Sequence, residues 1–490
     1  MSETDRLEYV HALTDAILAW TQRETARRPR VFHYGNADLT GAVRRVAHFE
    51  LVRHDPLYRA FRGEPFAGSL PLRFRWLRSV VEHVLARRVP CRQPLAQYAW
   101  DTLAGAAPWL MRYRHWRQRS FAARHHEPRE RPRVVFYAVT PKMYRYLRPL
   151  AQALQRRGEP YAFGTAFGMR ADFYLAQRQP CLAGAAGRSR SFRRRHPSLR
   201  QLRFFYDRIY AELARARPAC VVVCEGCHST DSLVAEAARE LGIRSVCLQQ
   251  GWAPKRVVNF MDMCFDRFVT WGEGFAEHLR PLNPEQRFSP LGSHILPAGA
   301  ALEETWNRLD TPERRAVAVA LQPDVNAIPA GTSRAMLEMT ARVAAAYPSQ
   351  HVLVREHPNR GVSDDERALL DGFANVSWND PNEIPLCDFL AQSAVVVALS
   401  STTLLEATVV GAVPVVVNLR PNQRHNPDLH AAGAGLQAEG IAEAERLIAR
   451  LITDDAYRRA FRAPMRRFAA HYFRQDGDPL SRILDHLLEQ

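Results

Sequence analysis

The predicted fold is decided by two segments, HVLVREHPNR at residues 351–360 and FLAQSAVVVALSSTTLLEATVVGAVPVVVNLRP at residues 389–421. Each contains a short apolar run, typical of a buried strand, that ends abruptly in polar residues. The second segment continues into a helical stretch over 404–410, then Gly411, then another apolar strand over 413–417. This strand–turn–helix–strand order is typical of a parallel sheet covered by helices.

Polar residues follow both predicted strands, 351–354 and 394–399. Ligands of open α/β sheets bind at the carboxyl ends of strands, and a helix N-terminus favours an anion through its unpaired N–H groups and its dipole. We therefore predict a nucleotide-phosphate site, to which the cation and the hydrogen-bonding groups of five residues contribute. These residues are Arg355, His357, Ser400, Ser401 and Thr402. In the alternative interpretation, Ser401 or Thr402 only caps the helix and His357 is only a loop residue.

The alternation of strands and helices begins well upstream of these segments. Further strands are predicted over 133–139, 161–167, 220–224, 245–248, 267–270 and 316–321. The stretch 290–293 reads as the crossing between two domains. We therefore predict an α/β fold class with two Rossmann-like parallel-sheet domains facing a cleft, over 131–292 and 293–490, the second ending in a helical tail with one break at 477–479.

The first 130 residues have a different character. Helical spacing of apolar residues and further stretches over 72–85 and 95–121 predict an N-terminal helical region, 1–130. Trp76 and Trp100 lie among arginines there, and we interpret such aromatic residues as core. A nucleic-acid or membrane surface is the alternative.

Composition sets the class of partner. The chain has 490 residues, 47% hydrophobic and 24% charged, and a net charge of +16. Such a charge suits a nucleotide, an acidic glycan, a lipid surface or a nucleic acid, although it also arises when arginine is used for any surface cation. No apolar run is long enough to span a bilayer, and MSETDRLEYV is no signal-peptide start, so we expect a cytoplasmic location.

Three cysteines lie close together, at Cys220, Cys224 and Cys227, with His228 adjacent. A zinc site would need a second ligand pair at a suitable spacing, and none follows. Because these cysteines lie in or directly after the apolar run ACVVVCEGC, we interpret them as small buried residues and expect no metal.

Three pairs of neighbouring residues follow predicted strands. In the predicted second domain these are His357-Pro358 and Ser400-Ser401, and in the first domain Glu225-Gly226. In their order and placement they resemble motifs of GT-B glycosyltransferases of bacterial surface polysaccharides, a group that includes sialyltransferases, Kdo transferases and CDP-glycerol glycerophosphotransferases. The resemblance covers about residues 133–490. It implies that the first two pairs contact a cytidine nucleotide and that the third carries the general base.

The sequence departs from this pattern at two places. Cys224 stands where a second acid is often found. Gln249-Gln250-Gly251 stands where several of these families have a Gln-His-Gly turn, so a catalytic histidine of that turn would be missing here. The second departure counts most against a glycerophosphotransferase.

The resemblance implies transfer of a sugar from a nucleotide-activated donor, best a CMP-linked sugar of the Kdo or sialic-acid type, to a bacterial surface-glycan or lipid-linked acceptor, without a cofactor or a metal. Arg355, His357 and the three hydroxyl residues hold the phosphate. Glu406, one helical turn beyond, hydrogen-bonds the ribose or is an exposed helix charge. The first choice for the base is Glu225, with His228 and Asp231 in reserve. The remaining candidates line the crevices, namely Gln250, Gly251, Trp252, Gln322 and Asp324.

Three other interpretations stay open. A nucleotide-sugar 2-epimerase would use the same donor site without an acceptor pocket. A basic nucleic-acid-binding protein would use the N-terminal region, although the sequence contains no nucleic-acid-binding motif. The same region is also a candidate to hold the enzyme on the anionic inner face of the membrane. Neither the acceptor, the linkage nor the stereochemical outcome follows from the sequence.

Overall fold

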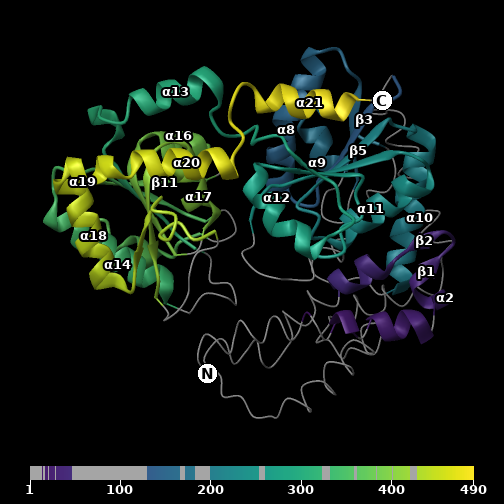
Figure 1. Ribbon diagram of the computed structural model, residues 1–490, viewed down its shortest axis with the longest axis horizontal. Helices are drawn as coiled ribbons and strands as arrows, with labels where there is room; N and C mark the ends of the chain where they lie inside the picture. Colours follow the sequence, from purple (N-terminus) through teal and green to yellow (C-terminus); the bar gives the residue numbers. More distant parts are fainter. Residues whose placement is uncertain are drawn as a thin grey trace, which may run out of the picture.

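The computed structural model describes residues 14, 17–19, 21–27, 29–46, 130–165, 171–182, 199–252, 260–322, 331–357, 361–381, 383–399, 401–419 and 427–489. Two lobes lie side by side, and each is built around a parallel six-stranded sheet (Figure 1). This confirms the predicted fold class. Among the described residues no helix has both the length and the apolarity needed to cross a membrane.

The first sheet has the strand order β4-β3-β5-β6-β7-β8, and all its neighbouring strands are parallel. The strands are β3 (Val134–Tyr137), β4 (Tyr161–Gly164), β5 (Cys220–Cys224), β6 (Arg244–Leu248), β7 (Arg267–Thr270) and β8 (Phe288–Pro290). The helices are α8 (Pro141–Arg156), α9 (Ala171–Ala176), α10 (Leu199–Ala216), α11 (Ser229–Glu240), α12 (Glu273–Leu279) and the short η3 (Arg280–Leu282).

The second sheet has the order β11-β10-β9-β12-β13-β14, again with parallel neighbours. Its strands are β9 (Ala316–Ala320), β10 (Val352–Arg355), β11 (Val376–Asn379), β12 (Ser393–Ala398), β13 (Val413–Val417) and β14 (Leu436–Ala438). The helices are α13 (Gly299–Asn307), η4 (Pro312–Arg314), α14 (Thr332–Ala346), α15 (Asp364–Arg367), α16 (Leu386–Ala391), α17 (Thr402–Val409) and α18 (Ile441–Thr453).

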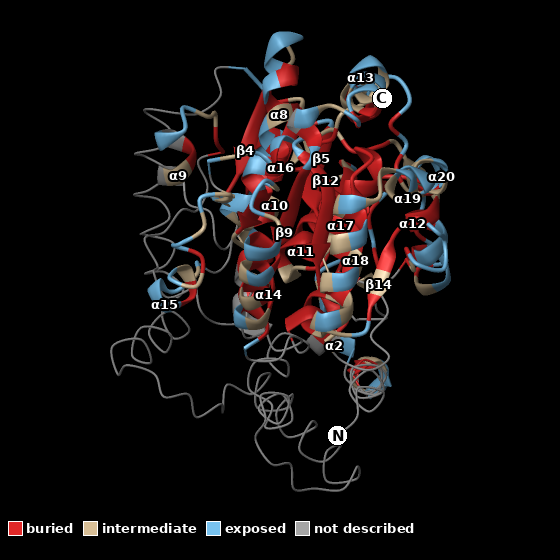
Figure 2. Ribbon diagram, turned by 90° about the vertical axis from the view of Figure 1, so that its left-hand side faces the viewer, coloured by how far each residue is buried: buried red, intermediate tan, exposed pale blue. Residues whose placement is uncertain are grey.

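The central strands β5, β9, β12 and β13 are apolar apart from Ser393, because helices cover both faces of each sheet. Every residue of β5, β9, β12 and β13 is buried, and Figure 2 shows buried strands between helices whose outer sides are exposed. Parallel sheets require such continuous apolar runs, since neither face meets water. The covered strands thereby become a rigid frame that fixes the residues at their ends.

The chain crosses between the two lobes twice, at 290–296 and at 473–479. Gln475, 3% exposed, ties the two crossings together: its Oε1 accepts from Ser293 N at 2.7 Å and its Nε2 donates to Ser293 O at 3.0 Å. Gly292 lies at the closest approach, because a Cβ there would meet Arg474 O at 2.2 Å. The junction is therefore a packed crossing of two segments.

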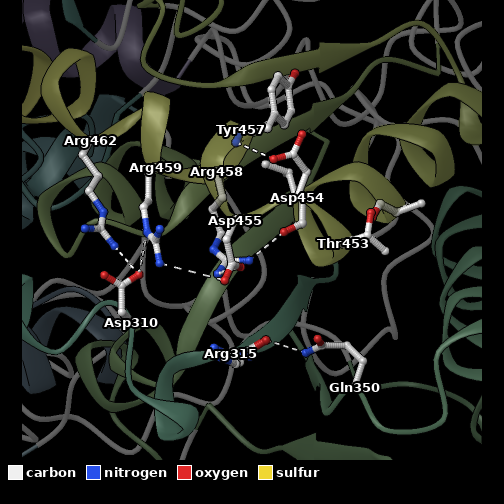
Figure 3. A network of polar contacts seen from close by, with 12 residues as sticks. Asp310, Arg315, Gln350, Thr453, Asp454, Asp455, Tyr457, Arg458, Arg459 and Arg462 are labelled. Carbon is white, nitrogen blue, oxygen red and sulfur yellow. Dashed lines mark hydrogen bonds and ion pairs between the residues drawn. The ribbon is translucent and has the colours of Figure 1, made fainter.

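The tail after α18 consists of α19 (Asp455–Ala460), α20 (Arg462–Tyr472) and α21 (Pro479–Leu488), with the predicted break between the last two. Arg459 and Arg462 both point at Asp310, at 3.3 and 2.6 Å from its Oδ1 (Figure 3). These arginines hold the pKa of Asp310 below its usual value, first through the hydrogen bond from Arg462. The contacts fasten α19 and the start of α20 to the second lobe.

The last helix returns to the first lobe. α21 lies beside α8, where Ile483, Leu484 and Leu487 are buried in the core of the first sheet (Figure 1). Arg244 of β6 donates to the carbonyls of residues 486 and 487 at 2.6 and 2.8 Å. The prediction that 293–490 forms one domain stays a prediction, but its final helix packs outside the second sheet.

The described part of the N-terminal region includes a hairpin that the sequence did not predict. After α2 (Pro29–Phe32), the short strands β1 (His33–Tyr34) and β2 (Ala37–Asp38) pair antiparallel. Asp38 N donates to Glu236 of α11 at 2.9 Å, which attaches the hairpin to the first lobe. The predicted helices over 72–85 and 95–121 lie outside the described residues.

Candidate functional site

The order of strands in each sheet identifies where a ligand would lie. In the first sheet the chain changes direction between β3 and β5, and in the second between β9 and β12. Ligands of open α/β sheets bind at such switch points, beyond the carboxyl ends of the strands. Glu225 follows β5, Gln322 follows β9 closely, and Ser401 and Thr402 follow β12. Candidates from both sheets therefore lie at the positions expected of a ligand site.

The two sets of strand ends meet. Beyond β6, Trp252 N donates to Thr402 Oγ1 at 3.4 Å, a long contact that joins the two lobes. On its other side the same turn approaches the first-lobe candidate base, since a Cβ on Gly251 would lie 3.4 Å from Glu225 Oε1. The structure thus brings Glu225, Gly251, Trp252 and Thr402 into one continuous site.

Arg355 is a buried cation held at the end of β10. It is 8% exposed, and its Nη1 donates to Asn379 Oδ1 and, at 3.0 Å, to Ile384 O. Its guanidinium also lies 5.3 Å from the centre of the Phe389 ring. Burial lowers its pKa, while Glu406 and Asp380 raise it, so the group stays charged at neutral pH. A fixed charge of this kind costs little reorganisation when an anion binds.

His357 lies just beyond Arg355 and has a different electrostatic character. Burial, and then the charge of Lys142, lower its pKa to about 4. At pH 7 it is a neutral imidazole, so it would serve a phosphate as a hydrogen-bond donor and add no positive charge. Its neighbour Pro358, like Ser400 and Asp324, lies outside the described residues. Gln322 lies two residues after β9, where its backbone oxygen accepts from Ser333 Oγ of α14 at 3.0 Å.

The hydroxyl residues after β12 already have local partners. Ser401 is the N-cap of α17, and its Oγ accepts from Thr403 N at 3.2 Å. This is the capping role that the sequence left open. Thr402 Oγ1 accepts the interdomain contact from Trp252. A phosphate at this helix end would therefore bind through backbone N–H groups and would compete with these contacts.

Glu406 is buried, 4% exposed, on the second turn of α17. The interpretation of Glu406 as an exposed helix charge is therefore wrong, because α17 packs this face inward. Burial raises its pKa to about 7, although the charges of Lys142 and Arg355 lower it. Tyr146 of α8 is close enough for the Glu406 charge to raise the tyrosine pKa. Glu406 thus lies among groups of both lobes.

Replacing Glu406 by glutamine should change how stability depends on pH. An acid whose pKa is raised on folding binds more protons when folded, so the wild type loses stability as the pH rises from about 4.5 to about 7. Glu406→Gln lacks this loss, which amounts to at most ~3 kcal/mol for such a shift. Urea unfolding at pH 5 and pH 8 measures the difference from wild type. Glu304→Gln, on exposed α13, is the control, and a pH slope equal to that of the wild type would contradict the expectation.

Glu225 has a backbone that few residues other than glycine adopt. Its φ is +65°, and Gly226 follows with φ +70°. Strain of this kind is found at functional sites when surrounding contacts enforce it. Here Glu225 N donates to Leu248 O at 2.9 Å, and Gly226 O accepts from Arg45 Nε at 2.9 Å. Arg45, itself 1% exposed, comes from the N-terminal region, so that region supports the candidate base.

The neighbours of Glu225 differ in their suitability as the base. Asp231 is fully buried and its Oδ2 accepts from His228 N at 3.0 Å, so its contacts favour the helix-capping role. Burial lowers the pKa of His228, which leaves a neutral imidazole able to accept a proton. Glu225 is less buried than Asp231, and its carboxylate lies beside the interdomain contact. Glu225 therefore remains the first candidate.

Glu225, Cys227 and His228 have ligand atoms within 4.8 Å of one another, a spacing compatible with a metal ion. Cys227 Sγ donates to Glu225 Oε2 at 3.2 Å, and burial raises the pKa of this thiol well above its usual value. The protonated thiol and the carboxylate therefore already form a hydrogen bond. The sequence-based expectation of no metal stays a prediction.

The turn after β6 is held by a network that no sequence pattern revealed. Gln249 Oε1 accepts from Trp271 N at 3.0 Å, and Tyr146 OH donates to Gln249 O. Gln250 is 8% exposed, and within the described part of the chain its Oε1 has no hydrogen-bond partner. Trp252 lies 4.8 Å from Phe275 between ring centres, so its ring packs in the first lobe. Gln250 is thus a polar group suited to a ligand.

The sequence matches no protein-family model and no curated protein. Solved structures do share its architecture. A protein from Listeria monocytogenes assigned as a UDP-N-acetylglucosamine 2-epimerase has a TM-score of 0.50 at 16% identity, covering 72% of this chain and 94% of that one. The UDP-GlcNAc 2-epimerase from Neisseria meningitidis bound to UDP-GlcNAc has a TM-score of 0.49 at 16% identity, covering 73% of this chain and 99% of that one. MurG from Acinetobacter baumannii has a TM-score of 0.48 at 14% identity, covering 73% of this chain and 99% of that one. The chain has a two-domain α/β fold of the GT-B type.

Proposed function

We propose that this protein is a glycosyltransferase that moves a sugar from a nucleotide-activated donor, best a CMP-linked sugar, to a bacterial surface-glycan acceptor. The observation that carries the proposal is the meeting of two unlike half-sites at one interdomain contact. One contains a carboxylate, Glu225, and the other contains Thr402 at the contact and a buried cation, Arg355, whose charge interacts with Glu406 of the same helix, α17. A base and a phosphate site are the two groups that glycosyl transfer needs.

In this mechanism the second lobe holds the nucleotide. Arg355 and the N–H groups at the start of α17 stabilise the negative charge that grows on the leaving phosphate, and neutral His357 donates a hydrogen bond to it. Glu406, whose pKa is about 7, accepts a hydrogen bond from the ribose or donates one to it. In the first lobe, Glu225 takes the proton of the acceptor hydroxyl, while the packed turn at 249–252 limits access of water.

A thermal-shift screen with CMP, CDP, UDP, GDP and TDP tests the donor half. A nucleotide that binds the folded state raises the melting temperature, and at 100 times its Kd it adds ~2.7 kcal/mol. We expect the largest rise with a cytidine nucleotide. A larger rise with UDP would replace the CMP-sugar assignment by hexose transfer, and no rise with any of the five would refute a nucleotide-sugar enzyme.

Incubation with the nucleotide sugar that carries the best-binding nucleotide then distinguishes a transferase from an epimerase. The protein is incubated with it in the absence of acceptor, and the products are resolved by NMR. A transferase should leave the sugar attached to the nucleotide or hydrolyse it slowly. A 2-epimerised sugar, either free or still attached to the nucleotide, would instead identify the epimerase that the sequence left open.

A further inference from the structure

Lys142 is unusual in this chain because of its residue type. Of the 67 lysine and arginine residues in the sequence, two are lysines, at positions 142 and 255. Lysine carries a compact ammonium with three donors, whereas arginine carries a planar fork, and the two are not interchangeable at a binding site. A lysine in a chain that uses arginine for nearly every cation is therefore informative. Lys255 lies outside the described residues.

The position of Lys142 adds a second observation. It is the second residue of α8, directly after the switch point of the first sheet, and the helix start is fixed by Thr140, whose Oγ1 accepts from Met143 N at 3.2 Å. Lys142 Nζ lies 4.0 Å from Glu225 Oε1, and its side chain is 49% exposed. The ion pair is longer than a hydrogen bond, so the ammonium keeps the freedom to contact a ligand beside Glu225.

The surroundings of Lys142 extend into the second lobe. Its charge lowers the pKa of His357, after burial, and it lowers the pKa of Glu406 more strongly than Arg355 does. One turn further along α8, the charge of Arg145 lowers the pKa of Arg355. Lys142 therefore lies near Glu406 and His357 of the second lobe, and Arg145 of the first lobe repels Arg355 of the second. An anion between them would relieve this repulsion.

We propose that Lys142 contacts the donor itself and binds an anionic group of the nucleotide sugar, so that both lobes hold the donor. This inference rests on the proposed function. Two parts of the donor have the required chemistry: the phosphate next to the departing bond, or a carboxylate carried by the sugar. In either case the ammonium moves from Glu225 toward the ligand, and Glu225 remains beside the acceptor hydroxyl.

The scarcity of lysine allows a direct test on the full chain. Reductive methylation with ¹³C-formaldehyde converts the two lysines and the chain's α-amino group into dimethylamines that keep their positive charge, so very few signals appear in a ¹³C spectrum. Lys142→Arg, methylated in the same way, identifies the Lys142 signal. The probes are CMP, UDP, UDP-GlcNAc with its neutral sugar, and CMP-N-acetylneuraminic acid with its carboxylate.

We expect the Lys142 signal to shift on titration. A shift with CMP or UDP alone assigns the phosphate as the partner, and a shift only with CMP-N-acetylneuraminic acid assigns the sugar carboxylate. Calorimetry with the same probes should show about 10- to 100-fold weaker binding for Lys142→Met, as expected for loss of a charge-assisted hydrogen bond. Lys142→Arg should restore part of the affinity.

The matched control is Arg148→Met, which removes another exposed cation of α8 whose charge acts on Tyr144. It should bind every probe within about twofold of wild type. If a nucleotide binds while the Lys142 signal does not move and Lys142→Met binds as tightly as wild type, the inference is overturned and the proposed function stands. If none of the probes binds, both are overturned.

Discussion

Replacing Glu225 by glutamine should lower kcat for sugar transfer by about 100-fold or more, while nucleotide binding stays within about twofold of wild type. Glutamine keeps the shape of the side chain and still accepts from Cys227, but it cannot take a proton from the acceptor hydroxyl. The loss should therefore fall on kcat, because the proposed donor site lies mainly on the second lobe. Steady-state kinetics with the donor found in the thermal-shift screen measure it.

Glu277→Gln is the control for this prediction. Glu277 is an exposed carboxylate of α12, paired with His471 at 3.2 Å, on the same lobe as Glu225. It should retain wild-type kcat and melting temperature. If Glu225→Gln keeps more than about a third of the wild-type kcat, Glu225 is not the base, and His228 becomes the next residue to replace.

Replacing Gly292 by alanine should also have a large effect and lower the melting temperature by roughly 5–10 °C. The residue has φ +98°, and an added Cβ would lie 2.2 Å from Arg474 O, a backbone atom of the other crossing segment. Moving this segment disturbs the bonds between Gln475 and Ser293. We estimate a cost of about 3–5 kcal/mol from overpacking and left-handed backbone together. Circular dichroism melting curves measure it.

The variant Gly242→Ala distinguishes the two causes of this loss, overpacking and the left-handed backbone. Gly242 also has a positive φ, +66°, but no atom lies within 4 Å of an added Cβ. It should lose only ~1 kcal/mol, the cost of the left-handed conformation. Equal losses at positions 242 and 292 would show that the close approach of the two crossing segments contributes nothing.

The sequence predicted the strands well because helices cover both faces of each sheet. The bounds predicted for β5, β7 and β13 coincide with those observed, since each is an unbroken apolar run. The helical stretch predicted over 404–410 starts two residues later than α17. The N-cap and first turn of α17 contain the polar residues Ser401, Thr402 and Thr403, which apolar periodicity does not detect.

The candidate site was only partly predictable, for a topological reason. Strand ends could be found along the chain, but which of them are neighbours depends on the order of strands in the sheet. Lys142, 83 positions before Glu225, was missed because β3 and β5 are adjacent only in the folded sheet. Arg45 was missed because no pattern links it to the loop it supports.

The return of α21 to the first lobe affects how the protein can be divided. A fragment that ends at residue 292 would lack the helix that covers part of its core, and a fragment that starts at residue 293 would carry Ile483, Leu484 and Leu487 without a surface to cover them. Joining residues 479–489 to the first fragment through a flexible linker should therefore improve its solubility. The first lobe is assembled from distant parts of the chain, so its core is complete only after residues 479–489 have been synthesised.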